Sequence, residues 1–478
     1  MRKTIYLGLA VYVLLVTAIL FVSFKDRVSD DPYITYRYAY NLVNRSVLEF
    51  NPGERVLSTT TPLFTLLLAL STILWHDIPH IAILIGAVSL PLGGICFYLL
   101  STRWGNSAVG WTGLALYPGF LLLVSLLGFE HPLYLAFCLA AFVSFAGQNW
   151  MLTAVFAALA SVTRPDGFLL SIVLACGYWI LYHKAGFPWK ALALFAAIVL
   201  PWYGFAWIYY GSPIPNTLFA KQQQGAMMIS QRFSSGILTF GAAYAKSWPY
   251  LIEIGLAFTG LVNLILRARK WVIILVWAVI YYLAYSLLGV SRYPWYYAPL
   301  IPGLLILVGL GIDGLQYLAA RSLPRFNRVR FPQILTITLI SILFVGQMLW
   351  LYNLRSQPDQ RGITYRQAGE WIKENLPPES TVGALEVGVL GYYSDRNMID
   401  FAGLIQPEVA RHLTPQSTYQ DSAFWSIKHY HPAYFVLYKG QFPLIEKTYA
   451  ANKCQKIKVF RTTLDSEPAQ LIIYSCQQ

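Results

Sequence analysis

Residues 4–40 of this 478-residue chain, TIYLGLAVYVLLVTAILFVSFKDRVSDDPYITYRYAY, decide its fold class. Residues 4–24 are apolar and follow two basic residues, and they end without the small residues of a signal-peptide cleavage site. About 20 apolar residues suffice for a helix that crosses a membrane. The stretch therefore predicts a retained membrane anchor, followed directly by a polar, tyrosine-rich segment.

The composition extends this prediction to most of the chain. Mean hydropathy is +0.50 and only 12% of residues are charged, whereas soluble domains carry about 25%. These values exclude a disordered, collagen-like or small disulfide-rich protein. The net charge of +13 lies almost wholly in residues 1–353, with 22 basic and 10 acidic residues. In a membrane protein such an excess indicates topology and contact with membrane lipids, and not nucleic acid.

Ten further apolar runs predict additional crossings. They are 81–101, 107–128, 131–147, 150–163, 167–182, 189–210, 249–266, 271–289, 297–318 and 332–353. The run 63–75 is too short to cross and predicts a re-entrant or interfacial piece. With the N-terminus and the basic connectors at 103, 183–190, 267–270 and 321–330 in the cytoplasm, 11 crossings result. A 13-helix bundle, with extra crossings in 60–101 or 211–248, is the alternative.

Residues 354–478 have the composition of a soluble domain and, in this topology, lie outside the cytoplasm. Tyr365–Asn375 is predicted as a helix, and Thr381–Leu385, Tyr434–Leu437, Lys456–Arg461 and Leu471–Tyr474 as strands. We therefore expect a mainly α membrane module, 1–353, and a C-terminal extracytoplasmic α/β domain. Cys454 and Cys476 are free to pair in such a compartment, but their spacing does not decide this.

The adjacent acids Asp30 and Asp31 are the first candidates for chemistry. Pro32 suits the first position of a helix, so Asp31 is expected at its N-cap and Asp30 nearer to a substrate. A cap with a solvated neighbour is the structural alternative. Two carboxylates at the lipid boundary are costly, which favours a function as a base or as ligands of a divalent cation.

Other charged residues fall on the same predicted side. Glu130 and His131 end a long uncharged stretch and are either loop residues or substrate contacts. Arg164 and Asp166 form either a structural turn pair or part of a site. The remaining candidates are Lys221, Arg292 and Tyr293; the last two are either interface anchors or part of a phosphate clamp.

The first outer loop, 25–62, resembles that of the GT-C membrane glycosyltransferases. The likeness rests on the segments 30–39, 50–56 and 61–65, and it is strongest to bacterial arabinofuranosyltransferase-like members, relatives of the protein mannosyltransferases. Segments 163–167, 215–221, 386–394 and 400–404 are similar too. The segments 45–48 and 57–60 depart from the family's usual glycine-rich and acidic patterns, which leaves the acceptor open.

The resemblance implies a GT-C bundle with a juxtamembrane helix carrying Tyr33, Tyr36 and Arg37. It implies an enzyme of the bacterial inner membrane that takes a pentose or hexose from a polyprenyl-phosphate carrier. The sugar passes to a hydroxyl of a glycan, lipid or protein, by inverting displacement with Asp30 or Asp31 as base. Some relatives use Mg²⁺ or Mn²⁺ and others do not, so no cofactor is assigned. A lipid-linked glycan flippase, a polysaccharide polymerase or ligase, and a non-catalytic scaffold are the alternatives.

Overall fold

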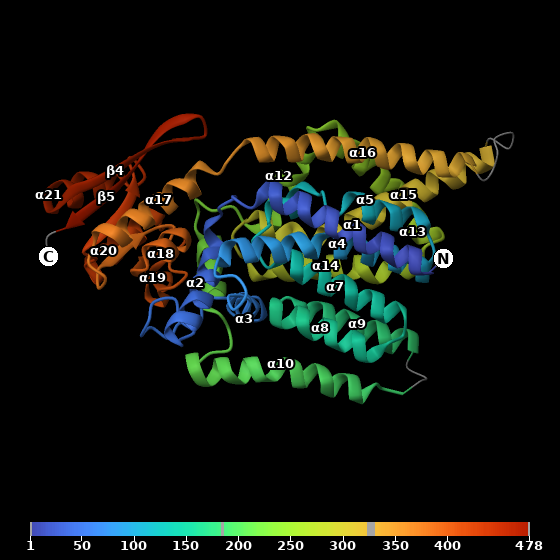
Figure 1. Cartoon of the computed structure of the whole chain (residues 1–478), viewed down its shortest axis with the longest axis horizontal. Coiled ribbons are helices and arrows are strands. Elements are labelled where there is room, and N and C mark those ends of the chain that lie inside the picture. Colours follow the sequence, from blue (N-terminus) through green and yellow to red (C-terminus); the bar gives the residue numbers. More distant parts are fainter. Residues whose placement is uncertain (1, 183–185, 323–329, 477–478) are drawn as a thin grey trace.

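The computed structural model describes residues 2–182, 186–322 and 330–476. Parts of two predicted cytoplasmic connectors, at 183–185 and 323–329, lie outside these residues. The described chain forms a helical bundle with a small mixed sheet at its C-terminal end (Figure 1).

Eight stretches of the described residues are long and apolar enough to cross a membrane. Their helices are α1 (Arg2–Phe24), α4 (Ile78–Trp104), α5 (Ser107–Leu116) with α6 (Leu121–Ser125), α10 (Trp189–Tyr210), α13 (Trp248–Leu266), α14 (Val272–Leu288), α15 (Ile301–Ser322) and α16 (Arg330–Ser356). The other three predicted crossings form shorter apolar helices, α7 (His131–Ala146), α8 (Trp150–Thr163) and α9 (Gly167–Tyr182). Each predicted run therefore corresponds to helix, in a multi-pass membrane protein.

Apart from α4, the two regions that the 13-helix alternative uses contain only helices of fewer than 18 residues in the part of the chain that the structure describes. The short run near 63–75 forms α3 (Pro62–Ser71), with only 10 residues, as predicted. Between α10 and α13 lie α11 (Asn216–Ala226), with 11 residues, and α12 (Phe233–Ala245). Because α3 and α11 are far shorter than a span, these helices favour the 11-crossing prediction, which stays a prediction.

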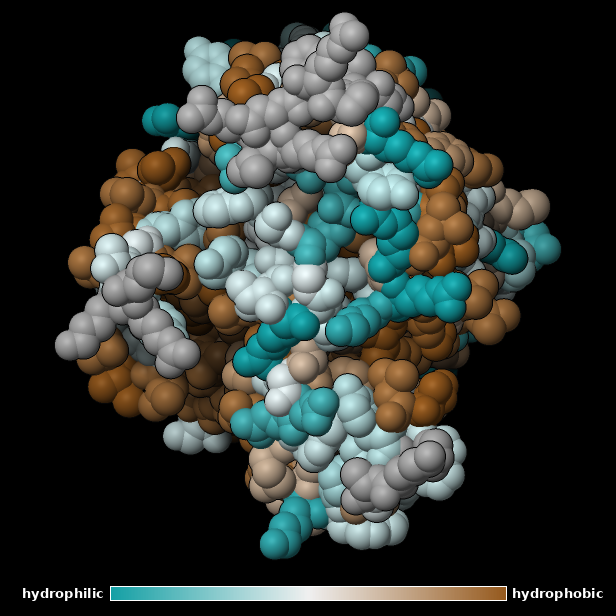
Figure 2. All heavy atoms as spheres, turned by 90° about the vertical axis from the view of Figure 1, so that its right-hand side faces the viewer, coloured by the Kyte–Doolittle hydropathy of each residue, from teal (hydrophilic) through white to brown (hydrophobic). Residues whose placement is uncertain are grey.

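The two ends of the bundle differ. The end that carries the N-terminus faces the viewer in Figure 2, where hydrophilic residues gather across the middle and hydrophobic residues cover the flanks. At the opposite end lie the C-terminal domain and α2 (Asp30–Arg45) (Figure 1). The apolar flanks are the surface expected to contact lipid.

The C-terminal domain is built on a five-stranded sheet with the order β2-β1-β3-β5-β4. β1 (Thr381–Ala384) pairs in parallel with β2 (Asn397–Asp400) and β3 (Tyr434–Tyr438), whereas β5 (Glu467–Cys476) pairs antiparallel with β3 and β4 (Cys454–Leu464). The remaining elements are the helices α17 (Gln360–Asn375), α18 (Gly388–Ser394), α19 (Pro407–His412), α20 (Tyr419–Tyr430) and α21 (Ala451–Lys453), with the π-helix η4 (Ile445–Ala450) directly before α21. The predicted helix and four strands are confirmed; β2 was not predicted.

Alternate residues of the central strands face opposite sides of the sheet. Val436 and Tyr438 pack in a core shared with α17, α18 and α2, whereas Phe435 and Leu437 pack against α20. One face of the soluble domain is therefore buried against the membrane module. The Cys454–Cys476 disulfide joins the paired ends of β4 and β5.

Candidate active site

A cavity of about 700 Å³ lies where the membrane module meets the C-terminal domain. Its wall contains residues from the first outer loop, from the starts of α7 and α9, from α11 and from the end of α14. Six of the predicted site residues line it: Asp31, Glu130, His131, Arg164, Asp166 and Lys221. Most of the remaining wall is apolar, so these groups act in surroundings of low dielectric.

Asp31, from α2, and Lys221, from α11, form one polar pair in the cavity. Lys221 Nζ lies 3.4 Å from Asp31 Oδ2 and 3.7 Å from the centre of the Tyr293 ring. Burial lowers the pKa of Lys221, but Asp31 and the surrounding tyrosine hydroxyls raise it more, and the net pKa lies above its usual value. Lys221 is therefore a cation at neutral pH. The Asp31 side chain remains about one-third exposed, at 32%.

Asp30 does not line the cavity. Helix α2 begins at Asp30 with Ser29 as its N-cap, so the expectation that Asp31 caps the helix is wrong. The Asp30 carboxylate accepts hydrogen bonds from the backbone N–H groups of Gly388 (3.1 Å) and Val389 (2.8 Å). Burial and the nearby Glu386 carboxylate raise the pKa of Asp30 well above its usual value. Asp30 therefore joins α2 to the start of α18, and Asp31 alone lines the cavity.

Arg164 is enclosed by acids. Its Nη1 donates to Glu130 Oε1, and its Nε lies 3.1 Å from Asp166 Oδ2. Tyr285 links the same groups, accepting from Arg164 Nη2 (3.0 Å) and donating to Asp166 Oδ2 (2.7 Å). Both acids share this one guanidinium, so Arg164 is not free to bind an anion. His131 Nδ1 is 3.4 Å from Glu130 Oε1 but forms no hydrogen bond with it.

Arg292, predicted as a phosphate contact, does not line the cavity. It is half-buried, with its guanidinium 5.9 Å from the centre of the Phe240 ring. Tyr293 lies behind Lys221 and donates a hydrogen bond to Gln224 Oε1 (3.2 Å). Of the two, only Tyr293 is positioned to influence the site.

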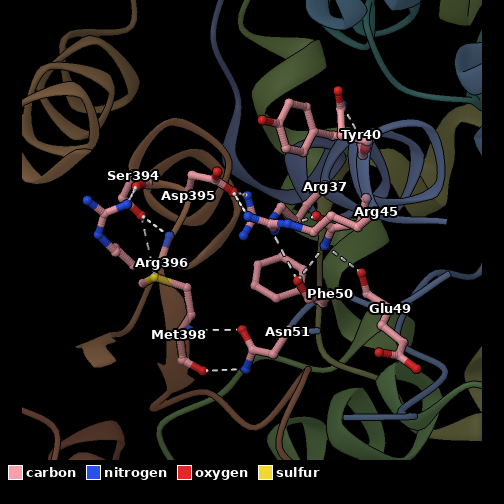
Figure 3. Close-up of polar contacts among 12 residues, drawn as sticks. Arg37, Tyr40, Arg45, Glu49, Phe50, Asn51, Ser394, Asp395, Arg396 and Met398 are labelled. Carbon is pink, nitrogen blue, oxygen red and sulfur yellow. Dashed lines mark hydrogen bonds and ion pairs between the residues drawn. The ribbon is translucent and has the colours of Figure 1, made fainter. Parts of the chain in front are cut away.

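The first-loop residues hold α2 to the C-terminal domain. Arg37 is buried and pairs with Asp395, to which Arg45 Nη2 also donates at 2.9 Å (Figure 3). In the same view Asn51 exchanges two hydrogen bonds with the backbone of Met398, of 2.8 and 2.9 Å. The rings of Tyr33 and Tyr36 pack on those of Tyr392 and Tyr393. These contacts fix the position of α2, and with it Asp31, relative to the C-terminal domain.

The loop after β2 approaches the cavity from the other side. Asp400 accepts from the backbone N–H groups of Ala402 (2.7 Å) and Ile405 (3.1 Å), which fixes the loop. Asn216 Nδ2 donates to the carbonyls of Gly403 (3.0 Å) and Leu404 (2.9 Å), and Gln224 Nε2 donates to Ala402 O (3.0 Å). Asn216 and Gln224 therefore hold both ends of α11, with Lys221 between them. Gln224 was not among the residues predicted to form the site.

The described residues do not provide a metal site. They contain no group of three or more His, Cys, Asp or Glu side chains placed to hold an ion. Asp30 and Asp31, the predicted shared ligands, bond in different directions: Asp30 to α18 and Asp31 to Lys221.

Residues 353–474 match a family described as a domain of unknown function (DUF8728). No curated protein matches the sequence. Among solved structures, ArnT from Cupriavidus metallidurans bound to undecaprenyl phosphate is 15% identical, with a TM-score of 0.63 over 97% of this chain and 98% of that one. Its apo state gives the same values over 99% and 98%.

The oligosaccharyltransferase of Archaeoglobus fulgidus, in complex with Zn and sulfate, is also similar. It is 13% identical, with a TM-score of 0.57 over 89% of this chain and 67% of that one. The similarity covers nearly the whole of the present chain in each case. This chain has the GT-C fold.

Proposed function

We propose that this GT-C chain is a membrane glycosyltransferase that takes a sugar from a polyprenyl-phosphate carrier. The observation that carries the proposal is the Asp31–Lys221 pair in a mostly apolar cavity, next to the membrane module. In such a transfer the sugar leaves the carrier phosphate while the acceptor hydroxyl loses a proton. A cation can bind that phosphate, and a neighbouring base can take that proton. The ArnT neighbour, with this fold, is bound to undecaprenyl phosphate.

In the proposed reaction an acceptor hydroxyl attacks the anomeric carbon of the donor sugar. The bond between that carbon and the phosphate oxygen breaks, and its electron pair stays on the polyprenyl phosphate. Lys221 Nζ leaves Asp31 to contact this phosphate, which frees the Asp31 carboxylate to take the hydroxyl proton. One displacement inverts the anomeric configuration. The base is assigned to Asp31 because Asp30 is already bonded to Gly388 and Val389.

Glu130, Arg164, Asp166 and His131 line the cavity and are proposed to contact the sugar or its acceptor, a glycan, lipid or protein hydroxyl. We assign the C-terminal domain to the extracytoplasmic side of the bacterial inner membrane, and the N-terminus to the cytoplasm. Two features support this assignment: the basic connectors, which the parity of the predicted crossings puts on the side of the N-terminus, and the Cys454–Cys476 disulfide, a bond typical of oxidising compartments.

The test is transfer by the purified protein in lipid vesicles. Undecaprenyl phosphates carrying arabinose, mannose, glucose or galactose are supplied one at a time with a cell-envelope extract as acceptor, and release of undecaprenyl phosphate is measured. One donor is expected to release undecaprenyl phosphate faster with the wild-type protein than with the Asp31→Asn variant. Equal release by both proteins for every donor refutes the function and favours a flippase or scaffold.

A further inference from the structure

A polar cavity of about 510 Å³ lies beside α2, on the side away from the candidate active site. Tyr33 of α2 lines it, whereas Asp31 and Thr35 line the active-site cavity. Residues two positions apart on a helix point about 200° apart, so the two cavities lie on opposite faces of α2. The rest of the wall comes from the residues directly after α1, from the start of α4 with the turn before it, and from α17 and α18, the second of which lies beside α2 (Figure 1). We name this cavity the lateral pocket.

The lateral pocket lies where an apolar surface ends. The last turn of α1 exposes Val22 (65%), and the turn after α3 exposes Leu74 (93%). Large apolar side chains exposed in this way on a membrane protein are expected to contact lipid. Lys25 and Trp75, which follow closely in the sequence, belong to the wall of the pocket, and Trp75 packs on Phe21 with ring centres 6.2 Å apart. A lipid whose chains lie against Val22 and Leu74 therefore has its headgroup beside the pocket.

Three cations line the lateral pocket: Lys25, Arg27 and Arg366. Lys25 is exposed and forms no ion pair with any residue that the structure describes. Arg27 Nη1 donates to the carbonyl oxygen of Leu354 (3.2 Å), and Arg366 Nε donates to Glu370 Oε1 (2.8 Å). Because a guanidinium has five N–H donors, both arginines keep donors for a ligand. Cationic donors of this kind bind a phosphate through charge-assisted hydrogen bonds.

The lateral pocket also carries two acids, which differ in their partners. Asp77 is occupied by His80, since its Oδ2 lies 2.6 Å from His80 Nδ1 and its Oδ1 accepts from the backbone N–H of His80 (3.2 Å). The side chain of Asp26 is 83% exposed, and its Oδ1 lies 3.9 Å from His80 Nε2. Asp26 therefore attracts a second cation and repels an anion. Cations and an acid in one pocket fit a headgroup that carries both a phosphate and an ammonium group.

We propose that the lateral pocket binds the phosphoethanolamine headgroup of a membrane phospholipid, with its phosphate on Lys25 and Arg27 and its ammonium on Asp26. This inference goes beyond the proposed function and does not depend on it. Basic pockets of membrane proteins bind lipid headgroups. The volume of about 510 Å³ lies within the range of small-ligand sites, about 300–1,000 Å³. A purely anionic headgroup, such as that of phosphatidylglycerol, lacks the ammonium for Asp26 and is repelled by it.

A headgroup in the lateral pocket contacts both the membrane module and the C-terminal domain. Lys25 belongs to the module and Arg366 to the domain, and both line the pocket. Between them the two parts meet directly, since Tyr33 Oη lies 3.4 Å from Tyr393 Oη, and the Arg366 guanidinium lies 4.9 Å from the centre of the Tyr393 ring. A ligand that binds only the docked, folded form stabilises it by mass action. Phosphatidylethanolamine should therefore raise the Tm of the protein.

The experiment follows thermal unfolding of the purified full chain in detergent micelles. Three compounds are added at rising concentration: dioctanoyl phosphatidylethanolamine, dioctanoyl phosphatidylglycerol and the chainless glycerophosphoethanolamine. Phosphatidylethanolamine should raise the Tm to a plateau, with its midpoint at a concentration about tenfold below that of phosphatidylglycerol, because only its ammonium pairs with Asp26. The chainless compound should need a higher concentration than the lipid, because no chains hold it beside Val22 and Leu74.

Two exposed residues of the pocket can be changed without loss of a buried contact. Lys25→Gln should raise the midpoint concentration of both lipids by about three- to tenfold, since the phosphate loses one cation. Asp26→Asn should raise the midpoint for phosphatidylethanolamine and lower it for phosphatidylglycerol, which removes the preference between the two. The matched controls are Lys373→Gln and Glu374→Gln, at exposed positions of α17 outside the pocket, and they should change neither midpoint.

Each other result overturns the inference. An unchanged Tm with phosphatidylethanolamine, or equal midpoints for both lipids, shows that the pocket does not recognise this headgroup. The same midpoint for the chainless compound and the lipid makes the ligand a free phosphate ester and not a membrane lipid. A response of Lys25→Gln or Asp26→Asn equal to that of the α17 controls places the lipid elsewhere on the protein. None of these results bears on sugar transfer, which is tested separately.

Discussion

Asp30 and Asp31 are neighbours in sequence, yet replacing each by asparagine should give opposite results. Asp31→Asn removes the proposed base and keeps the size of the side chain. A positioned general base contributes roughly 10²–10⁴-fold, so kcat should fall by about that factor. Lys221 is buried and Asp31 is about one-third exposed, but the asparagine oxygen can still accept a hydrogen bond from Lys221 Nζ. We therefore expect a smaller loss of stability than the ~3–5 kcal/mol of an abolished buried pair.

Asp30→Asn acts on the docking of the C-terminal domain. The carboxylate accepts two backbone N–H groups, and an asparagine offers one oxygen and turns its own N–H₂ toward the other donor. Leaving one buried backbone N–H without an acceptor costs about 1–3 kcal/mol, which is the expected loss of stability. The variant is also free of the electrostatic repulsion between Asp30 and Glu386, which offsets part of this loss.

The assay measures both quantities on the same preparations. Purified variants in vesicles are tested for release of undecaprenyl phosphate with the donor that the wild-type protein uses, and thermal unfolding is followed in parallel. We expect Asp31→Asn to be stable and nearly inactive, and Asp30→Asn to be less stable and still active once folded. An active Asp31→Asn protein beside a stable, inactive Asp30→Asn protein refutes the assignment of roles.

Four further outcomes are expected. Lys221→Ala should weaken undecaprenyl phosphate binding about ten- to a hundredfold through a lost charged contact, measured by titration, whereas Arg292→Ala, away from the cavity, should leave it unchanged. Arg164→Ala leaves Glu130 and Asp166 buried without their cation and should cost about 3–5 kcal/mol of stability, seen as a lower Tm; an unchanged Tm contradicts the enclosed arrangement. Burial raises the pKa of Glu386 from 4.5 to about 7, against the opposing effect of Arg361. The stability that the protonated Glu386 contributes is therefore complete below pH 4.5 and is lost as the pH rises through 7. The variant Glu386→Gln should flatten the fall in Tm between about pH 5 and 8. A membrane-impermeant thiol reagent should label Gln416→Cys from outside intact cells and not Arg269→Cys, and the reverse pattern overturns the sidedness.

The fold was largely predictable because hydropathy acts over long windows. The apolar runs and the short α3 follow from length alone, which decides whether a helix spans a bilayer. The strand β2 escaped prediction because its four residues begin with Asn397 and end with Asp400, and only the middle two are apolar. Its place in the sheet depends on pairing with β1, far from any local pattern.

The site was predictable in its parts and not in their roles. The predicted crossings placed Glu130, Arg164 and Lys221 on the same side of the membrane as Asp31. In the structure these residues line one cavity. The choice between Asp30 and Asp31 depends on contacts with Gly388 and Val389, about 360 residues away, which local helix-capping rules do not contain. The pairing of Arg164 with Asp166 was one of two predicted alternatives, whereas its contact with Glu130, 34 residues away, lies outside any local pattern.

The hydrogen bonds from Asp30 to α18 also determine when the newly made protein can complete its candidate site. Helix α2 leaves the ribosome early, but the backbone amide that it binds follows 358 residues later. At about 5–20 residues per second, that interval lasts roughly 20–70 s. During this time the C-terminal domain that positions α2 and Asp31 does not yet exist. The loop after β2, which holds α11 and Lys221, is also absent. In the proposed mechanism, a chain still being synthesised lacks the contacts that position Asp31 and Lys221, so we expect a chain cut short before Gly388 to be inactive.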